Sequence, residues 1–398
     1  MPTARRNDAM KRKKERIKNI FTGKILILLV ISCLELQSLG QKTDLRDQKI
    51  SLLFLGDIMG HDEQIWAAEN RENRTYNYDS VFKYIKPVIS DSDVAIANFE
   101  VTLAGTPYGG YPRFSSPAAL ASACKNSGID YFVTANNHAA DRGNSGISGT
   151  INRLDSLGIP HTGTFADQAS RDSLQPLMIR KKGFSIALLN YTYGINGIKV
   201  PPPAVVNILN KSLITSDIQK AKNRKPDIII LFLHWGTEYD TVPSGMQIDL
   251  TEYFFSQGVD LVIGSHPHVI QKMMWYKKDQ LNKDRVVVFS LGNFVSNQRK
   301  PKTDGGSMVW IEITRDEKSV YISNTGFYLT WVYTPIENYR KKFFVLPCSE
   351  FENGPEFFKN PADFAQMKRF IDDSRSLLYR QNLNFRENIY SGYSWILN

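Results

Sequence analysis

Short apolar runs alternate along the chain with amphipathic stretches of helical length from residue 51 onward. Apolar runs that contain β-branched residues are typical of buried strands, and apolar positions three or four residues apart are typical of helices. Their alternation indicates β-α-β units that feed a largely parallel sheet, so we predict an α/β fold. The predicted strands are residues 51–57, 94–100, 131–138, 227–236, 260–268, 285–294 and 308–314.

The segments between these strands predict helices and one hairpin. The hairpin, residues 176–192, turns at Lys182 and Gly183, and Pro87 interrupts the first helix. Beyond Pro335 the alternation decays, and we treat residues 336–398 as a C-terminal extension without assigned chemistry: a packed lid, a partner surface or a simple extension. The predicted helices are residues 78–92, 115–128, 144–158, 212–224, 247–258 and 362–379.

Residues 1–40 have the layout of a secretory signal peptide. Nine basic side chains lie within the first 24 residues, and an apolar run at residues 25–34 follows them. This run is shorter than the ~20 residues that span a bilayer, which favours cleavage before Gln41. Lipidation of Cys33 and retention as an N-terminal membrane anchor are the alternatives. All three predict an exported protein of the periplasm or cell envelope.

The basic character of the chain resides mostly in that segment. Residues 1–40 carry nine basic and three acidic side chains, so the formal charge falls from +9 for the whole chain to +3 for residues 41–398. Nucleic-acid binding needs a clustered basic face, and we therefore expect no nucleic-acid partner. Cys124 and Cys348, the two cysteines beyond residue 40, either pair in an oxidising compartment or remain buried thiols.

Polar residues follow five of the predicted strands, at the point where each strand ends. Ligands of open α/β sheets bind beyond the carboxyl ends of the strands, so we expect these side chains to meet at a common edge. Pro267, between two of the histidines, is expected to stiffen an extended turn so that both imidazoles face one site. The residues are Asp57, Glu100, Asn137, His138, His234, His266 and His268.

Taken together, these side chains suit divalent metal ions. Carboxylate, amide and imidazole ligands in one set favour Mn, Fe or Zn, whereas Mg and Ca prefer oxygen alone. The two carboxylates, one amide and three imidazoles apart from His138 exceed the ligands of one tetrahedral ion, but two ions ~3.5–4 Å apart would use all six. Each residue also has a structural alternative, such as a helix cap for Asp57 or a core histidine for His234. Their shared position after strands favours the metal site.

Six motifs resemble those of a known family in order and spacing: FLGDIMGH, ANFEVTLAG, GIDYFVTANNHAADRG, LHWGTEYDTVPSGMQ, GVDLVIGSHPHVIQ and VVFSLGNF. They are similar to the CapA family of poly-γ-glutamate capsule-synthesis proteins, which resembles the calcineurin-like metallophosphoesterases. The similarity covers about residues 50–300. It implies a four-layer α/β/β/α sandwich of the metallo-dependent phosphatase type in residues 41–335, with two metal ions on the sheet edges.

The resemblance also implies a role for each motif residue. Asp57 and His268 would bind the first ion, and Glu100 would bridge the two ions. Asn137, His234 and His266 would bind the second ion. His138 would serve as a general acid for the leaving group, or would stabilise developing negative charge.

Two positions depart from the phosphoesterase pattern. Met59 stands where that pattern has a histidine, and Glu100 bridges where the pattern has an aspartate. The first ion therefore lacks a nitrogen ligand. Either His61 substitutes for it from the loop, or this ion is held weakly and His61 is an exposed loop residue.

Four further residues are candidates for substrate or additional contacts: Arg113, Asp141, Arg142 and Glu238. An arginine here could grip a phosphate or an acidic polymer. The alternative is that they are surface charges, or that they hydrogen-bond to a ligand histidine.

Two functions are compatible with this sequence. The first is a hydrolase of a phosphoester or amide bond, acting on an anionic envelope polymer or its phosphorylated precursor. The second is a non-catalytic assembly factor whose metals fix a surface for the polymer or for membrane-bound synthase subunits. An extra acid, His138, has little use in a scaffold, so the sequence favours the enzyme.

Overall fold

The structure is a computed structural model that describes residues 48–278, 283–391 and 394–397. The signal-peptide prediction for residues 1–40 lies outside the described residues. The fold below is that of the compact unit Lys49–Thr314 with Ser319–Asn398. Within the described ranges, no helix combines the length and the apolar character that crossing a membrane requires.

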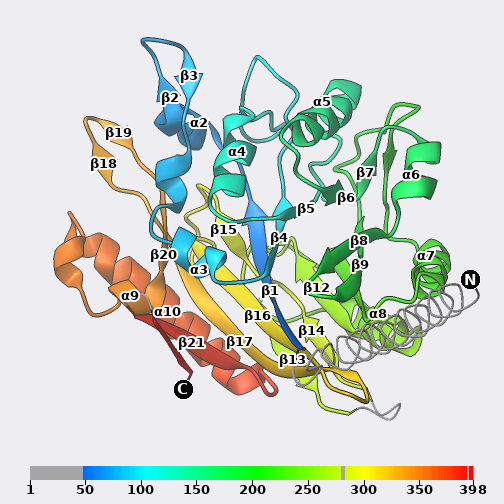
Figure 1. Cartoon of the computed structure of the whole chain (residues 1–398). Coiled ribbons are helices and arrows are strands. Elements are labelled where there is room, and N and C mark those ends of the chain that lie inside the picture. Colours follow the sequence, from blue (N-terminus) through cyan, green and yellow to red (C-terminus); the bar gives the residue numbers. More distant parts are fainter. Residues whose placement is uncertain (1–47, 279–282, 392–393, 398) are drawn as a thin grey trace, which may run out of the picture. The chain divides into compact units, whose positions relative to one another are not determined.

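Two large sheets form the centre of this unit (Figure 1). The ten-stranded sheet has the order β22 (Ser394–Leu397), β21 (Arg386–Ser391), β17 (Val320–Tyr333), β16 (Gly305–Arg315), β1 (Gln48–Ile58), β4 (Val94–Phe99), β5 (Tyr131–Val133), β6 (His161–Thr162), with β15 (Asn293–Val295) on β1 and β20 (Phe344–Pro347) on β17. The six-stranded sheet has the order β13 (Met273–Tyr276), β14 (Arg285–Val288), β12 (Leu261–Ser265), β11 (Ile228–His234), β9 (Phe184–Thr192), β8 (Leu177–Lys181).

Each sheet has a parallel core. In the large sheet β15, β1, β4, β5 and β6 pair in parallel, and in the small sheet β9, β11, β12 and β14 do so. Parallel neighbours end at the same edge of their sheet. The polar residues that follow these strands are thereby gathered at one edge of each sheet.

Successive side chains of a strand point to opposite faces of the sheet, and in these strands both faces are buried. On β1, Leu52 and Phe54 belong to the cluster between the sheets, whereas Leu53 and Leu55 belong to the cluster under the helices. The helices that contribute to the outer clusters are α3 (Lys86–Ser90), α4 (Ala119–Asn126) and α5 (Gly143–Ser156) on the large sheet, and α7 (Lys211–Asn223) and α8 (Gly245–Ser256) on the small sheet.

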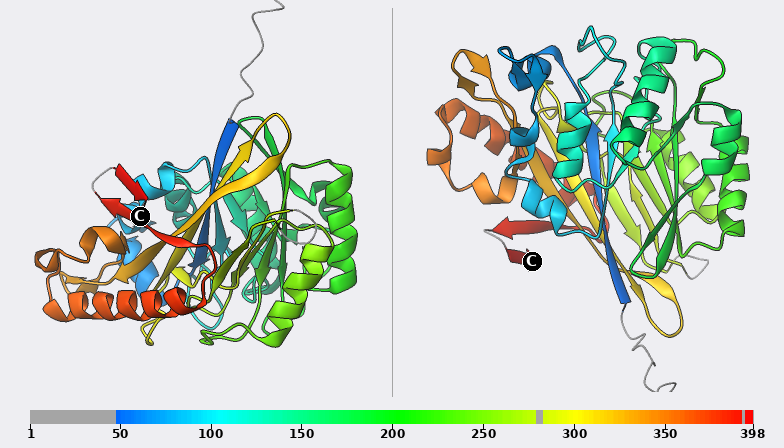
Figure 2. Two further views of the ribbon diagram at one scale, coloured as in Figure 1. Left: turned by 90° about the horizontal axis from the view of Figure 1, so that it is seen from below. Right: turned by 45° about the horizontal axis from the view of Figure 1, so that its top comes forward.

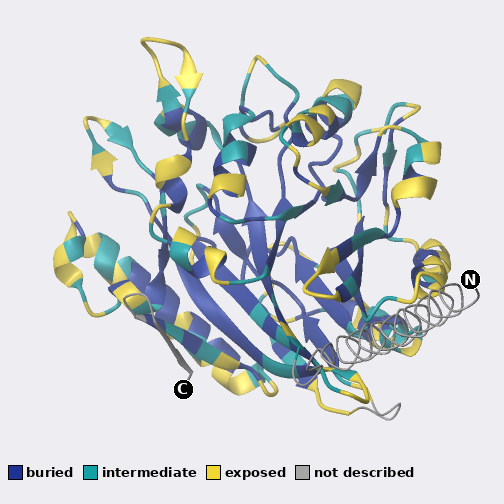
Figure 3. Ribbon diagram, in the orientation of Figure 1, coloured by how far each residue is buried: buried dark blue, intermediate teal, exposed yellow. Residues whose placement is uncertain are grey.

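The layer order is therefore helices, sheet, sheet, helices, and the predicted four-layer α/β/β/α sandwich is confirmed (Figure 2). Strand residues are buried almost without interruption, as the dark sheet region of Figure 3 shows. Surface loops carry the smaller elements: α2 (Asp62–Ala68), β2 (Glu69–Asn70), β3 (Thr75–Tyr76), η1 (Asp79–Phe82), β7 (Thr164–Phe165), α6 (Gln168–Leu174), β10 (Val205–Val206), β18 (Ile336–Glu337), β19 (Arg340–Lys341) and η2 (Pro355–Phe357).

The segment after residue 335 packs against the large sheet. Strand β20 pairs antiparallel and β21 pairs parallel with β17. Helix α10 (Pro361–Gln381) places Met367, Phe370 and Ile371 in the same cluster as the residues between the sheets, and α9 (Cys348–Phe351) precedes it. Figure 2 shows α10 lying along the sheet. In its described part, the segment thus extends the core.

Two predicted elements differ from the observed ones. The helix predicted at residues 78–92 is two short helices, η1 and α3, because Pro87 starts a new helix in its first turn. The strand predicted at residues 285–294 is two strands, β14 and β15, which lie in different sheets. Both Cys124 and Cys348 are buried free thiols, so they do not pair.

The passage from β14 to β15 requires glycine. Gly292 has φ 73°, a left-handed conformation that other residues adopt only with strain. Its carbonyl accepts a 3.0 Å hydrogen bond from the Asp57 amide, and a Cβ on Gly56 would lie 2.0 Å from the same oxygen. The close backbone approach of Gly56 and Gly292 fixes Asp57 beside the point where the chain changes sheets.

We expect Asp217→Asn in α7 to lower the free energy of unfolding by about 3 kcal/mol at pH 7, because it breaks a buried ion pair with Arg171. Burial alone would raise the pKa of Asp217, but hydrogen bonds from Tyr191 and Arg171 outweigh it and lower the pKa. A lowered pKa stabilises the fold above the unfolded value of about 4, and this stabilisation is lost as the pH falls through the folded pKa.

Urea unfolding at pH 7 and at pH 3.5 measures the free energies of unfolding of Asp217→Asn and of the unmodified chain. The difference between these two free energies should be smaller at pH 3.5. The matched control is Asp172→Asn, since Asp172 is a largely exposed neighbour of Arg171 and should not change stability. Equal stability of Asp217→Asn and the unmodified chain at pH 7 would contradict the prediction.

Candidate metal centre

Side chains from the carboxyl ends of both sheets meet in one buried cluster. Asp57 lies near the end of β1 and Glu100 follows β4, while Asn137 and His138 follow β5. From the small sheet, His234 ends β11, and His266 and His268 follow β12. All seven side chains are at most 4% exposed. The structure thus brings together the residues that the sequence placed after strands.

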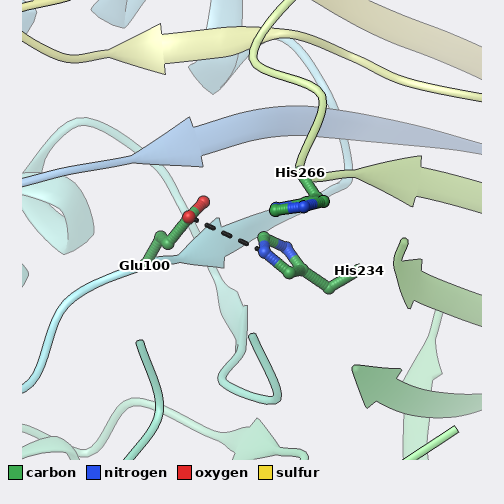
Figure 4. A group of neighbouring side chains, drawn as sticks. All are labelled: Glu100, His234 and His266. Atoms are coloured by element: carbon green, nitrogen blue, oxygen red, sulfur yellow. Dashed lines mark ion pairs between the residues drawn. The ribbon is translucent and has the colours of Figure 1, made fainter. Parts of the chain in front are cut away.

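Five of the cluster's side chains and one exposed glutamate form three overlapping groups, and within each group the possible ligand atoms lie within 4.8 Å of one another. Figure 4 shows the first, in which the side chains of Glu100, His234 and His266 converge. The second group is Asp57, Glu100 and His268, and the third is Glu238, His266 and His268. Glu100 belongs to two of them, as a carboxylate between two ions would.

Asn98, the fifth residue of β4, holds the two carboxylates in place. Its side-chain amide donates to Asp57 Oδ1 at 2.8 Å and to Glu100 Oε2 at 3.1 Å. We did not single out Asn98 from the sequence. The period of two along a strand offered a signal, because Asn98 and Glu100 lie two positions apart and share a face.

The backbone around Pro267 is bent. His266 has φ 101° and His268 has φ 58°, so neither residue is extended and the predicted extended turn is wrong. Left-handed conformations at two non-glycine residues on either side of a proline cost on the order of 1–3 kcal/mol each. They turn both imidazoles toward the carboxylates, and such strain is typical of functional sites.

Hydrogen bonds assign a role to each nitrogen of His268. Its Nδ1 lies 3.0 Å from Asp57 Oδ2 and 3.1 Å from Asn293 Oδ1, two acceptors that favour a proton on Nδ1. Its Nε2 lies 3.9 Å from Glu100 Oε1 and keeps a free lone pair. Asn293, in β15, was not predicted; a hydrogen bond that orients a ligand imidazole is typical of metal sites.

His234 is oriented in a similar way. Its Nδ1 lies 2.9 Å from Ser265 Oγ, and its Nε2 lies 2.9 Å from Asn137 Oδ1 and 3.6 Å from Glu100 Oε1. The ring of Tyr193, which follows β9, lies 4.5 Å from that of His266. Tyr193 was not predicted as a site residue. It directly follows the second strand of the hairpin predicted at residues 176–192, and no site residue was expected at the end of a hairpin.

Burial shifts the pKa values of Glu100, His234 and His266 toward the uncharged forms of these side chains. Burial, and then the charge of Asp57, raises the pKa of Glu100 well above its usual value. Burial, and then the neighbouring imidazoles, lowers the pKa of His234, and burial and His268 lower the pKa of His266 to about 3. His234 and His266 are therefore neutral at pH 7, the form in which imidazole binds metals.

Within the three metal-binding groups, two buried side-chain atoms have no hydrogen-bond partner: Glu100 Oε1 and His266 Nδ1. An unsatisfied buried polar atom costs about 1–3 kcal/mol, and two in one group need an explanation. A cation would satisfy both and offset the repulsion between Asp57 and Glu100. The residues present therefore fit a divalent metal centre. Their mixed oxygen and nitrogen atoms suit Mn, Fe or Zn.

The position of the missing nitrogen ligand is apolar. Met59 is 2% exposed and belongs to the cluster under the helices of the large sheet. His61 caps α2, with Nδ1 3.1 Å from Gln64 Oε1 and 3.2 Å from the Asn297 amide, and burial lowers its pKa to about 4. His61 belongs to none of the three groups, so the structure gives it no ligand position.

Glu238 approaches the cluster from the exposed side. It lies in the loop after β11, and its carboxylate forms the third group together with His266 and His268. Each of these two histidines also belongs to one of the other two groups. The sequence had left Glu238 as an additional contact or a surface charge. The structure brings it to the centre as a third carboxylate.

His138 is held by an acidic partner. Its Nδ1 lies 2.8 Å from Asp141 Oδ2, and the same oxygen accepts a 2.7 Å hydrogen bond from the Phe114 amide. The Phe114 ring packs edge-on against the imidazole at 4.6 Å. His138 therefore has one orientation, with Nδ1 directed at the carboxylate.

Arg113 and Arg142 make a different kind of contact. Arg142 Nε donates to the Arg113 carbonyl at 3.1 Å, and the Arg113 side chain is exposed. Together, Asp141 and Arg142 hold the backbone of residues 113 and 114 beside His138. Neither arginine lies in the three metal-binding groups.

We expect Glu100→Gln to weaken Mn²⁺ binding by more than about 100-fold, since this carboxylate is common to two groups. Isothermal titration calorimetry of the chelator-treated full chain measures the affinity and the number of ions. Glu72→Gln, at an exposed loop position, is the control and should bind as the unmodified chain does. Undiminished binding by Glu100→Gln would exclude the bridging role.

Glu238→Gln should weaken Mn²⁺ binding about tenfold, less than Glu100→Gln does, because Glu238 belongs to one of the three groups and Glu100 to two. The same titration measures this affinity. Asp240→Asn alters an exposed carboxylate in the same loop and serves as the control. If both ions bind Glu238→Gln with unchanged affinity, Glu238 is not a ligand.

Comparison with known proteins places this geometry in a family. The family described as "Bacterial capsule synthesis protein PGA_cap" matches residues 51–298, more than half of the chain. The chain is 28% identical over 317 residues to the capsule biosynthesis protein CapA of Bacillus anthracis, covering 75% of this chain and 74% of that protein. It is 27% identical over 281 residues to the PGA biosynthesis protein CapA of Bacillus subtilis, covering 68% and 69%.

Solved structures show more distant likenesses. The calcineurin-like phosphoesterase YfkN from Bacillus subtilis is 13% identical, with TM-score 0.41, over 83% of this chain and 98% of that chain. The NAD nucleotidase of Haemophilus influenzae is 14% identical, with TM-score 0.44, over 87% of this chain and 65% of that chain, slightly under two thirds of its length. The sheet order and core described above establish the fold without them. On its matched residues, the chain belongs to the family of bacterial capsule synthesis proteins.

Proposed function

We propose that the protein is a two-metal hydrolase of a phosphoester or polymer bond in capsule synthesis. The observation that carries the proposal is the pair of unpartnered buried atoms, Glu100 Oε1 and His266 Nδ1, beside an imidazole that is not needed as a ligand. Unpaired buried polar atoms need an explanation, and a bound cation would supply one for both of these atoms. The pairing of His138 with Asp141 supports an enzyme over a scaffold.

The ligands divide into two sets that share Glu100. Asp57, Glu100 and His268 would hold one ion, and Glu100, Asn137, His234 and His266 would hold the other, with Glu238 as an additional carboxylate. Bound divalent ions supply Lewis acidity and lower the pKa of water. Asn98 holds the carboxylates of Asp57 and Glu100 in place, and Asn293 fixes the ring of His268.

His138 is the proposed acid for the leaving group. With Nδ1 bonded to Asp141 Oδ2, the other nitrogen, Nε2, is the one that can exchange a proton with substrate. Asp141 stabilises the protonated ring and prevents it from rotating, so it is a positioning residue. The contact of Phe114 with the ring excludes water from one side of this pair.

The proposed substrate is an anionic envelope polymer or its phosphorylated precursor. The name of the family and the names of the two relatives support capsule synthesis as the process. The basic and apolar segment at residues 1–34 supports a site of action outside the cytoplasm, where membrane-bound synthase subunits would be partners. Poly-γ-glutamate is the proposed polymer.

We expect His138→Ala to lower kcat by about 10²–10⁴-fold on a substrate with a poor leaving group, with an unchanged number of bound ions. The assay uses metal-loaded full chain with phosphodiester, phosphomonoester and γ-glutamyl chromogenic substrates. His161→Ala is the control, because His161 is a half-buried histidine in β6 that belongs to none of the metal-binding groups.

Two results would count against this function. Turnover that His138→Ala leaves unchanged would remove the assigned acid. Full metal loading without turnover of any substrate class would instead favour a non-catalytic assembly factor.

A further inference from the structure

A cavity of about 360 Å³ lies between the loop that connects β15 to β16 and helix α10. It is separate from the residues of the metal centre, and its lining is highly charged. The charged side chains that line it are Arg299, Lys302, Asp304, Arg369 and Asp373. We call it the Arg299 cavity. Its size lies within the range of small-ligand pockets.

Arg299 has donors without acceptors. Its Nη1 donates to the Gln298 carbonyl at 3.0 Å, but Nε and Nη2 are buried and have no hydrogen-bond partner. Across the described ranges, no carboxylate forms an ion pair with it. Burial lowers the pKa of Arg299 to about 10, although the charges of Asp304 and Asp363 oppose this, so the guanidinium remains charged at pH 7.

The two unpartnered nitrogens lie on one edge of the guanidinium plane. This edge presents two parallel N–H groups and matches the two oxygens of a carboxylate. The same molecule contains such a pair: Arg375 donates from Nε to Glu387 Oε2 at 2.7 Å and from Nη2 to Glu387 Oε1 at 2.8 Å. Arg299 offers the edge that Arg375 uses, without an acceptor.

The charges of the lining favour a singly charged anion over a dianion. Three cationic side chains and two carboxylates line the cavity, and Asp363 and Glu63 also act on Arg299, so the surroundings carry no excess positive charge. Asp304 Oδ2 is occupied, since it accepts from Trp331 Nε1 at 2.8 Å and from Gln366 Nε2 at 2.9 Å. A carboxylate adds one negative charge beside Asp304 and Asp373, whereas a phosphate dianion would add two.

The loop that carries Arg299 also contacts the metal centre. Asn293, whose Oδ1 lies 3.1 Å from His268 Nδ1, donates to Gln298 Oε1 at 2.9 Å. Lys300 lies 4.1 Å over the ring of Tyr239, the neighbour of Glu238. A chain held at the cavity would therefore run beside the loop that borders the centre.

We propose that the Arg299 cavity binds a carboxylate group of an acidic chain, by the free side-on edge of Arg299, at a distance from the metal centre. The carboxylate chemistry follows from the cavity alone. That the molecule carrying this carboxylate is the polymer on which the metal centre acts is a further step, and this step rests on the proposed function.

The experiment is calorimetric titration of the chelator-treated full chain with a γ-linked glutamate trimer and, separately, with inorganic phosphate. Without metal there is no turnover, so this binding is measured whether or not the protein is a hydrolase. We expect the trimer to bind. Arg299→Gln should weaken it by at least about tenfold, and Arg299→Lys should do the same because lysine keeps the charge but lacks the fork. Arg180→Gln, at an exposed residue of β8, should bind as the unmodified chain does.

Four outcomes would overturn the proposal: no binding of the trimer, equal binding by Arg299→Gln, full affinity in Arg299→Lys, or Arg299-dependent binding of phosphate but not of the trimer. If Arg299→Gln does not fold, Lys302→Gln and Arg369→Gln test the cavity instead. Both residues lie at its rim, where Lys302 is partly exposed and Arg369 is exposed. Each should weaken the trimer several-fold, and unchanged affinity in both would refute the site.

Discussion

The repulsion between two buried carboxylates is the constraint on which the centre depends. Asp57 and Glu100 share a water-free site at the junction of two sheets, where a negative charge is costly. The side-chain amide of Asn98 bonds to both, and the imidazoles of His234, His266 and His268 surround them. Such a set is stable only with positive charge supplied from outside the protein, which is why we interpret it as a metal centre rather than as a polar core.

Most of the fold could be predicted from residue pattern alone. Parallel strands with two buried faces read as continuous apolar runs, and polar residues at their carboxyl ends were correctly expected to meet. Periodicity could not show that the strands belong to two sheets, because it records burial on two faces and not the neighbour that covers each. The passage of residues 288–293 from one sheet to the other depends on a single glycine conformation, which an apolar run conceals.

The candidate site divides in the same way. Residues that end strands were found by position, whereas Asn98, Tyr193 and Asn293 were missed, although each lies in or beside a strand. Their importance comes from hydrogen bonds and ring contacts between residues far apart in the sequence, such as the bond from Asn98 to Asp57, 41 positions away. The bend at His266 and His268 was also missed, since left-handed histidines are uncommon and only the surrounding structure imposes them.

The switch of the chain between sheets at Gly292 has a mechanical consequence. One covalent segment joins the sheet that carries His266 and His268 to the sheet that carries Asp57. The halves of the centre therefore cannot slide past one another without breaking the hydrogen bond between Gly292 and Asp57. Any adaptation to a bound molecule must fall to the surface loops, while the spacing of the residues that form the centre stays constant.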